Sequence, residues 1–377
     1  MNFELSDEQK LLKDSVARLL GDRYGFEARK GYAQEHDGFS RPMWMQYAEL
    51  GLLALPFEEK YGGIGGNAVD TMLVMEAFGR ALVIEPYLAT VVLSGSLLRF
   101  GGNDKQRDAY LPKIAGGELT MAFAHAEPQA RYTLSDVKTT ARKDGDAYIL
   151  DGPKTLVLHG DSANTFIISA RLSGAQRDTT GLALFIVDAK ASGLTRRGYA
   201  TNDGQRAAEL TLTNVRVSAD AVLGTPGEAY PLIERVIDIA IAAQCAEAVG
   251  AMSVMHEMTV DYLKTRKQFG VPIGNFQVLQ HRAAEMLIAL EQARSMAMLA
   301  AITAEDENVA ERRNAISAAK VQICNSSRLV GQQATQLHGG IGMTMEYAVG
   351  HYFKRVTAIA ATFGDAAHHL DILARAC

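Results

Sequence analysis

Tyr262-Leu-Lys-Thr-Arg266-Lys-Gln268-Phe269-Gly270-Val-Pro272-Ile273-Gly-Asn-Phe276-Gln277-Val-Leu-Gln280 is the most distinctive stretch of the chain. Glycine accepts the left-handed conformation of a helix C-terminus, and a proline soon afterwards cannot continue the helix. We therefore expect a helix to end at Gly270. The turn would project Arg266, whose rigid fork of N–H donors suits bidentate contact with a phosphate.

A second stretch, Gln336-Leu337-His338-Gly339-Gly340-Ile341-Gly342-Met-Thr344, separates two apolar segments with helical periodicity. Glycines at such a place let a ligand approach the bare backbone. Each stretch also has a simpler interpretation when it is taken alone. Arg266 could pair with a surface acid, and the glycines could merely turn a corner.

Together, in this order and about 70 residues apart, the two stretches resemble the paired flavin-binding motifs of acyl-CoA dehydrogenases. The resemblance covers nearly the whole chain, including Leu5-Ser6-Asp7-Glu8-Gln9, the glycine-rich run up to Gly66, Glu127-Pro128 with Ser135-Asp136, and Asp151-Gly152-Pro-Lys154. It implies FAD as cofactor, held partly across a dimer interface. More narrowly, the chain resembles the small subunit of pimeloyl-CoA dehydrogenases, which are heteromeric members of the family.

The resemblance assigns contacts with the pyrophosphate and adenosine half of FAD residue by residue. They fall on Arg266, Gln268, Phe269, Ile273, Gln277, Gln336, Gly339 and Gly340. His338, inside the glycine stretch, is open to two interpretations, a cofactor contact or a structural hydrogen bond.

Composition sets broad limits. A chain of 377 residues with 48% hydrophobic content is long enough for two or three domains. Its net charge of −5 gives no electrostatic reason to expect nucleic acid or an anionic membrane as partner. The three cysteines, Cys245, Cys324 and Cys377, show neither a disulfide framework nor a metal-ligand spacing. No apolar run approaches the ~20 residues of a membrane span, and the start lacks signal-peptide features, so we expect a cytoplasmic protein.

The periodicity changes twice along the chain and indicates an α+β protein. We expect an N-terminal helical domain at 1–118, a central β domain at 119–226 and a C-terminal helical bundle at 227–377. Ser6 and Gln9 form a capping-box pattern before a helix with Leu11, Val16 and Leu20 on one face. The short β-branched or alternating runs are 137–141, 147–150, 165–170, 182–188 and 209–217. Spacing leaves a sandwich or a barrel open, whereas the resemblance implies a small antiparallel barrel and a four-helix bundle.

The resemblance also implies a reaction, α,β-dehydrogenation of an acyl-CoA thioester. This chemistry needs a base for the α proton and a flavin that accepts hydride from Cβ. The family's usual glutamate position falls on Phe363, and its alternative position on a bundle helix falls on Ala240. The nearest acids are Asp365 and Asp238. Either could act otherwise, Asp365 as a helix cap and Asp238 as an ion-pair partner.

The flavin-ring positions depart from the family pattern as well. Leu156 and Leu158 stand where the family commonly has a tryptophan and a hydroxyl residue, and Ala126 replaces a threonine. Because these losses fall on one side of the cofactor, we expect a heteromeric enzyme. In this hypothesis a sister subunit supplies the base, the ring pocket and most of the acyl site, and this chain clamps the pyrophosphate.

Two other hypotheses stay open. One is a self-sufficient homotetrameric dehydrogenase that uses Asp365, and the other is a flavin-binding partner subunit without catalysis. For an active enzyme, the resemblance implies electron-transferring flavoprotein as oxidant. Pimeloyl-CoA, another dicarboxylyl-CoA or a bulky acyl-CoA could be the substrate. No metal is expected, since His368 and His369 point to different helix faces and have no evident third ligand.

Overall fold

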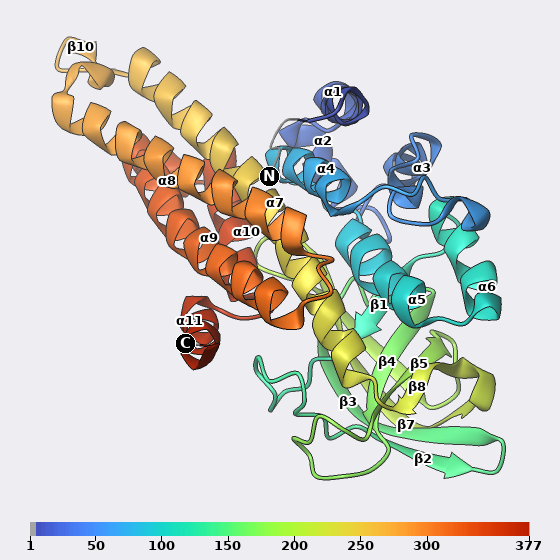
Figure 1. Cartoon of the computed structure of the whole chain (residues 1–377). Coiled ribbons are helices and arrows are strands. Elements are labelled where there is room, and N and C mark those ends of the chain that lie inside the picture. Colours follow the sequence, from blue (N-terminus) through green and yellow to red (C-terminus); the bar gives the residue numbers. More distant parts are fainter. Residues whose placement is uncertain (1–4, 377) are drawn as a thin grey trace. The chain divides into compact units, whose positions relative to one another are not determined.

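The computed structural model describes residues 5–376, which fall into two compact units (Figure 1). The helical unit contains the chain up to Gly31, Ala68–Val83, and everything from Ile241 onward. The sheet unit contains Tyr32–Asn67 and Ile84–Ala240. The domain boundaries expected at 118 and 226 remain predictions.

The helical unit is built from six whole helices, all but the last residue of α2, and part of α7. They are α1 (Asp7–Arg23), α2 (Phe26–Tyr32), α4 (Ala68–Ala81), α8 (Gln277–Thr303), α9 (Val309–His338), α10 (Ala348–Ala361), α11 (Ala366–Ala376), and the later part of α7 (Tyr230–Thr265). The predicted capping box opens α1, because Ser6 Oγ accepts from the Gln9 N–H and the Gln9 side chain accepts from the Ser6 N–H. Val16 and Leu20 are buried, but Leu11 is exposed, so the apolar face is narrower than predicted.

The C-terminal helices pack tightly. α8 and α9 lie side by side, and both α10 and α11 contact α9 (Figure 1). Small residues such as Ala289, Ala293 and Ala319 are buried on these helices and allow their backbones to approach closely. The prediction of a helical C-terminal part is confirmed.

Two glycines bring α4 and α7 into backbone contact. A Cβ atom at Gly79 would collide with the carbonyl oxygen of Glu247, and one at Gly250 would collide with that of Glu76. The contact is therefore reciprocal, since each helix contributes one glycine and one carbonyl. Neither position can hold a larger residue without moving a helix.

The sheet unit combines short helices with a large sheet. Its helical elements are α3 (Arg41–Glu49), η1 (Leu52–Ala54), η2 (Glu59–Tyr61), the π-helix η3 (Leu88–Gly95), α5 (Ser96–Gly101), α6 (Asp104–Ala115) and η4 (Ala219–Ala221). Its strands are β1 (Met121–Ala124), β2 (Thr140–Asp144), β3 (Ala147–Leu158), β4 (Thr165–Arg171), β5 (Leu182–Asp188), β6 (Leu194–Ala200), β7 (Arg206–Ser218) and β8 (Val222–Gly227).

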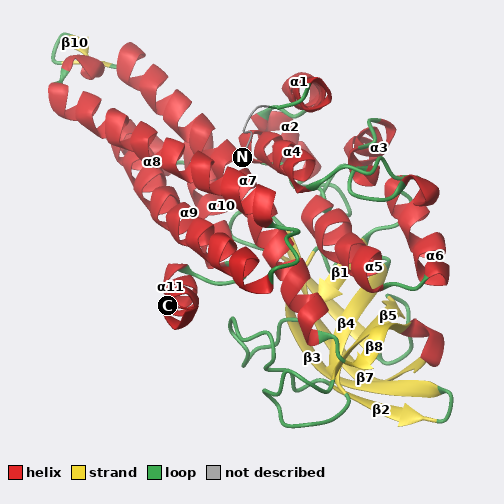
Figure 2. Ribbon diagram, viewed as in Figure 1, coloured by secondary structure: helices red, strands yellow, loops and turns green. Residues whose placement is uncertain are grey.

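The sheet is open and mixed, which corrects the expectation of a closed antiparallel barrel (Figure 2). Its order is β6-β7-β3-β2-β4-β5-β8, and within the described residues no pairing joins β6 to β8. β1 runs parallel to β4, and β2 meets β4 in parallel at Arg171. Period-two alternation identifies a strand but not its partner or direction, so the sequence could not distinguish these arrangements.

The most distinctive stretch forms a hairpin, and the predicted helix end at Gly270 is wrong. α7 ends at Thr265, and β9 (Lys267–Gln268) pairs antiparallel with β10 (Val271–Pro272) before η5 (Ile273–Asn275) (Figure 2). The two turn residues both have positive φ, 54° at Phe269 and 82° at Gly270, as a type I′ hairpin turn requires. Glycine was needed for this turn and not for the end of a helix.

Two helices, α7 and α8, are long and apolar enough to cross a bilayer by length and composition, which corrects the expectation that no such segment exists. The most apolar window of α7 is 100% buried, and that of α8 is 39% buried. The core helix of a water-soluble protein meets the same criterion, so this finding is weak support for a membrane location.

Candidate functional site

A groove of about 690 Å³ lies in the helical unit where the hairpin, α8 and the end of α9 meet. Six of the eight residues assigned to the cofactor line it: Arg266, Gln268, Ile273, Gln336, Gly339 and Gly340. Phe269 and Gln277 do not. Phe269 is 91% exposed at the hairpin turn, where its ring meets Phe276 edge-on. The structure thus brings two stretches that are about 70 residues apart in sequence to one place.

Arg266 is fixed at its backbone and unpaired at its side chain. Its N–H donates to the Tyr262 carbonyl at 2.8 Å, and its carbonyl accepts from the Ile273 N–H at 2.8 Å. Its guanidinium makes no hydrogen bond or ion pair with any residue in the range 5–376. An anchored arginine with unused donors, facing a groove, is suited to bind an anion.

A second arginine, Arg282 of α8, also lines the groove and was missed by the sequence analysis. Its Nη1 donates to Gln333 Oε1 of α9 at 3.2 Å. Among the described residues, no aspartate or glutamate lines this groove. A basic residue inside a helix belongs to no motif, so only the fold could reveal its position.

The glycine turn, η6 (Gly339–Met343), provides bare backbone. A Cβ atom added at Gly339 or Gly340 would meet nothing within 4 Å, and Gly339 has a φ of 64°. His338 is buried next to the turn, with Nδ1 2.8 Å from the Ala334 carbonyl and its ring between those of Tyr262 and Tyr347. Burial lowers the pKa of His338, which keeps the ring neutral. The Nδ1 contact is a structural hydrogen bond, and His338 also lines the groove, so both interpretations remain predictions.

The turn before α11 carries Phe363, on which the resemblance places the base, in a strained conformation. Phe363 has a φ of 58° and Gly364 a φ of 118°. Positive φ is unfavourable for a bulky side chain and persists only where the surroundings enforce it. Here the buried Lys320 Nζ donates to the Thr362 carbonyl at 2.9 Å and also to the Ile359 carbonyl.

His369 of α11 supports the same turn, because its Nε2 lies 3.1 Å from the Phe363 carbonyl and its Nδ1 lies 3.1 Å from Ser317 Oγ. Burial lowers the pKa of His369 to about 4, and the charge of Lys320 acts in the same direction. Asp365 Oδ1 accepts from the His368 N–H at 2.9 Å. Asp365 therefore caps α11, as one of its two predicted interpretations proposed.

The other predicted base positions lie in the sheet unit and offer little chemistry. Ala240 is fully buried, and Asp238 is buried with a partner. At the expected ring positions, Leu156, Leu158 and Ala126 have no polar side-chain atom. Leu158 and Ala126 therefore provide no side-chain hydrogen bond, and Leu156 provides no aromatic ring to flank a flavin.

The scaffold behind these positions is intact. Lys154 Nζ is buried and donates to Glu127 Oε1 at 2.7 Å and Ser169 Oγ at 3.1 Å. Burial alone would raise the pKa of Glu127, but Lys154 and the hydrogen bonds that Glu127 accepts lower it to about 2. The Thr155 N–H donates to the Ala126 carbonyl at 2.9 Å and joins the two segments. The backbone beside the expected ring positions is therefore held in place, whereas Leu156, Leu158 and Ala126 offer no polar side-chain atom.

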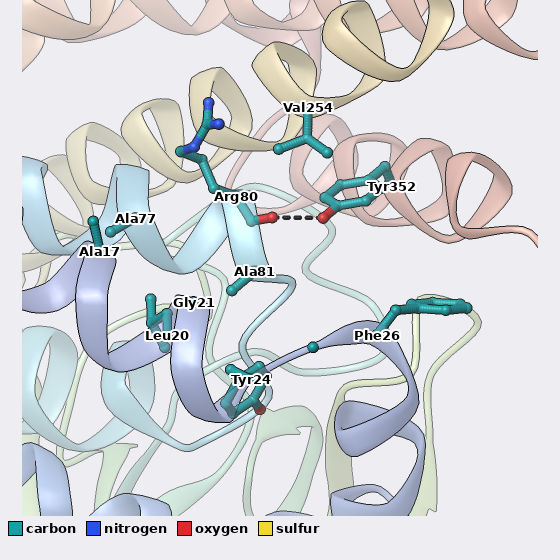
Figure 3. Close-up of a pocket in the computed structure, with 11 residues that line it drawn as sticks. Ala17, Leu20, Gly21, Tyr24, Phe26, Ala77, Arg80, Ala81, Val254 and Tyr352 are labelled. Carbon is teal, nitrogen blue, oxygen red and sulfur yellow. Dashed lines mark hydrogen bonds between the residues drawn. The ribbon is translucent and has the colours of Figure 1, made fainter. Parts of the chain in front are cut away.

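A smaller hollow of about 310 Å³ lies in the helical unit between α1, α4, α7 and α10 (Figure 3). Figure 3 shows the Tyr352 hydroxyl donating to the Arg80 carbonyl beside it. The Arg80 guanidinium is already bound to both carboxylate oxygens of Glu257, at 3.0 and 2.9 Å. Arg80 is the charged residue among the described lining of this hollow, and its charge is paired with Glu257.

The described residues contain no cluster of three or more metal-ligating side chains. Cys245 and Cys324 are buried free thiols, and Cys377 lies outside the described residues. The candidate site is therefore the groove with its two arginines and bare glycine turn.

Three models of one family match almost the whole chain. The N-terminal, middle and C-terminal domains of acyl-CoA dehydrogenase match residues 6–118, 122–215 and 231–377. The probable acyl-CoA dehydrogenase YngJ of Bacillus subtilis is 31% identical over 93% of this chain and 92% of its own length. FadE12 of Mycobacterium tuberculosis is 32% identical over 92% of this chain and 90% of its own.

Solved structures agree. An acyl-CoA dehydrogenase from Geobacillus kaustophilus superposes with a TM-score of 0.91 at 25% identity, over 100% of this chain and 99% of its own. A variant of the Tcur3481-Tcur3483 steroid ACAD superposes with a TM-score of 0.88 at 28% identity, over 98% of this chain and 97% of its own.

Proposed function

The chain belongs to the acyl-CoA dehydrogenase family, and from this premise we propose that it is the small subunit of a heteromeric enzyme. Members of the family are flavin-dependent oxidoreductases that act on CH–CH bonds, and their cofactor is FAD. In the proposed assembly, this chain holds part of the cofactor while a sister subunit carries the base and the flavin-ring pocket.

The observation that carries the proposal is the contrast between the two ends of the cofactor site. The groove keeps Arg266 with its guanidinium donors unused, a bare glycine turn, and no carboxylate among its described lining residues. The base and ring positions hold Phe363, Leu156 and Leu158, none of which has a polar side-chain atom. A chain that oxidised a substrate by itself would require a base and polar side chains at these positions.

The groove residues fit the diphosphate half of FAD. Arg266 would bind a phosphate with its fork of N–H donors, and Gly339 and Gly340 would let the ligand reach the backbone. When bound, FAD supplies the acceptor for the hydride that leaves the Cβ atom of the substrate. Each of these assignments to a residue is part of the proposal.

An uncovered apolar surface supports assembly with another chain. On α8, Val278 and Ile288 are each 60% exposed, and Leu287 is also exposed. Large apolar side chains exposed to water are unfavourable, and a protein–protein interface would bury such residues. We propose that a sister acyl-CoA dehydrogenase subunit covers it, with a second copy of this chain as the alternative partner.

The substrate is proposed as a class, an acyl-CoA with a dicarboxylic or a bulky acyl group. Pimeloyl-CoA follows from the resemblance to the pimeloyl-CoA dehydrogenase small subunit. The likeness to a protein described as a steroid ACAD supports a bulky acyl group instead. Electron-transferring flavoprotein is the proposed oxidant and the cytoplasm the proposed location.

Purifying the chain alone and titrating it anaerobically with pimeloyl-CoA tests the proposal. We expect the chain to be colourless, or yellow without bleaching of its flavin absorbance. Bleaching would contradict the heteromeric proposal and return Asp365 to consideration as the base. A steroid side-chain CoA thioester serves as the second substrate.

Substitution of Arg266 in the assembled protein separates the proposal from a role that is purely structural. We expect Arg266→Gln to lower the FAD content of the assembly without dissociating its subunits. If Arg266→Gln retains all its flavin, the chain does not clamp the cofactor, and the hypothesis of a structural partner gains support.

A further inference from the structure

Two guanidinium groups from different parts of the fold line the groove. Arg266 follows α7 and belongs to the hairpin, whereas Arg282 lies on the second turn of α8. The family resemblance assigned a role to Arg266 and none to Arg282. The position of Arg282 therefore requires an explanation from the structure itself.

The charge around the groove is unbalanced. Two arginines line it, and the described residues contribute no carboxylate to its lining. Like charges that face one groove repel each other, so the arrangement is unfavourable until an anion enters. An anion with two negative charges would compensate both arginines, and two linked phosphates carry two such charges.

Arg282 is oriented rather than neutralised. Its contact with Gln333 uses Nη1, and arginine has five N–H donors, so most of them remain for a ligand. Gln333 is neutral, which leaves the positive charge of Arg282 intact. The backbone of Arg266 is separately fixed by its bonds to Tyr262 and Ile273. Both guanidinium groups thus keep donors available to one ligand in the groove.

We propose that Arg282 is a second diphosphate-binding residue, and that together with Arg266 it makes the groove selective for two linked phosphates over one. This inference rests on the proposed function, since it takes FAD to be the ligand of the groove. It adds a residue and a selectivity that neither the motif nor the resemblance contains.

The test uses the flavin-free assembled protein and three ligands, FAD, ADP and AMP, measured by calorimetric titration. ADP has the diphosphate and AMP has one phosphate. The ratio of the affinity for ADP to the affinity for AMP therefore reports the contribution of the second phosphate to binding. Removing a hydrogen bond to a charged group costs about 1.5–3 kcal/mol. We therefore expect Arg282→Gln to lower the affinity for FAD and for ADP about 10- to 100-fold. The affinity for AMP should fall less than threefold.

Two further variants control for charge and for folding. Lys267→Gln removes the same charge from the hairpin, at a residue that does not line the groove, and should change each affinity less than threefold. Arg282→Lys keeps the charge but loses the planar fork, and should still lower the preference for ADP over AMP. Arg282→Lys also replaces Arg282→Gln as the decisive variant if the glutamine protein fails to assemble.

The outcomes distinguish this inference from the proposed function. Arg266→Gln could lower the affinity for FAD while Arg282→Gln binds all three ligands as the unmodified protein does. In that case the proposal for Arg282 is overturned and the proposed function stands. If Lys267→Gln lowers the ligand affinities as much as Arg282→Gln does, the general positive charge of the region explains the effect. The proposal is then likewise overturned. If the unmodified assembly binds neither FAD nor ADP, both proposals fall.

Discussion

The buried ammonium group of Lys320 donates a hydrogen bond to the carbonyl oxygen of Thr362, 2.9 Å away, and so fixes the backbone immediately before Phe363. The same ammonium also binds the Ile359 carbonyl at the end of α10. Lys320 thus satisfies the Thr362 carbonyl beyond the helix end and gives the Ile359 carbonyl a second donor beside the Thr362 N–H. The turn keeps its form although the residue that it presents has no acid–base chemistry.

Lys320→Met should therefore destabilise the helical unit. The substitution removes the donor of the Thr362 carbonyl and leaves the Ile359 carbonyl with the Thr362 N–H alone, which costs about 1–3 kcal/mol in the free energy of unfolding. Chemical denaturation followed by circular dichroism measures the loss. Arg328→Met, an exposed change on the same helix, is the control and should stay within about 0.5 kcal/mol. Equal stability of the two variants would show that these hydrogen bonds contribute nothing.

Asp365 can be tested with two substitutions that separate capping from acid–base chemistry. Asparagine caps a helix about as well as aspartate but cannot take up a proton. We expect Asp365→Asn to match the unmodified protein in stability and in turnover of the assembled enzyme, and Asp365→Ala to lose about 1 kcal/mol of stability. Abolished turnover in Asp365→Asn with unchanged stability would identify Asp365 as the base after all.

The buried His369 should make stability depend on pH. Its pKa falls to about 4 in the folded protein, below the ordinary histidine value of 6.5, because burial disfavours the charged form. The unfolded chain therefore binds more protons between these two values, and stability declines as the pH falls from 6.5 towards 4. The decline should be shallower in His369→Gln than in the exposed-residue control His36→Gln. Identical slopes would contradict the assignment.

Phe269→Asn should stabilise the isolated chain. Phe269 has a φ of 54° and is 91% exposed, so the phenyl ring carries backbone strain without much burial. Asparagine is the preferred residue of an Asn-Gly type I′ turn and should raise the unfolding free energy by about 0.5–1 kcal/mol. The same variant should bind its partner subunit less tightly if that ring is covered in the assembly. Analytical ultracentrifugation measures the second effect.

The sequence predicted those parts of the fold that depend on local rules. The capping box of Ser6 and Gln9 was predicted and observed, and β5 has the predicted bounds Leu182–Asp188. β1 was missed because all four of its residues are buried, so it shows no alternation. Strand partners arise from long-range contacts, and the parallel pairing of β1 with β4 could not be read from periodicity.

In the candidate site, too, residues in sequence motifs could be predicted and residues placed by long-range packing could not. Arg266 and the glycine stretch belong to motifs, so their proximity could be expected before the structure was known. Arg282 belongs to none, and its place in the groove depends on how α8 packs against α9. The Phe269–Gly270 turn was mistaken for a helix end because a glycine followed by a proline is common to both.

The glycine contact between α4 and α7 fixes one point of α7, so the length of helix that follows sets the position of Arg266. Gly250 cannot slide or rotate against α4, and Arg266 follows it by 16 residues along a nearly continuous helix. Each residue of an α-helix advances the chain by about 1.5 Å and turns it by about 100°. A single inserted or deleted residue between the two would swing Arg266 away from the groove. The length of this segment should therefore be preserved among relatives that bind the same cofactor, even where its individual residues are free to change.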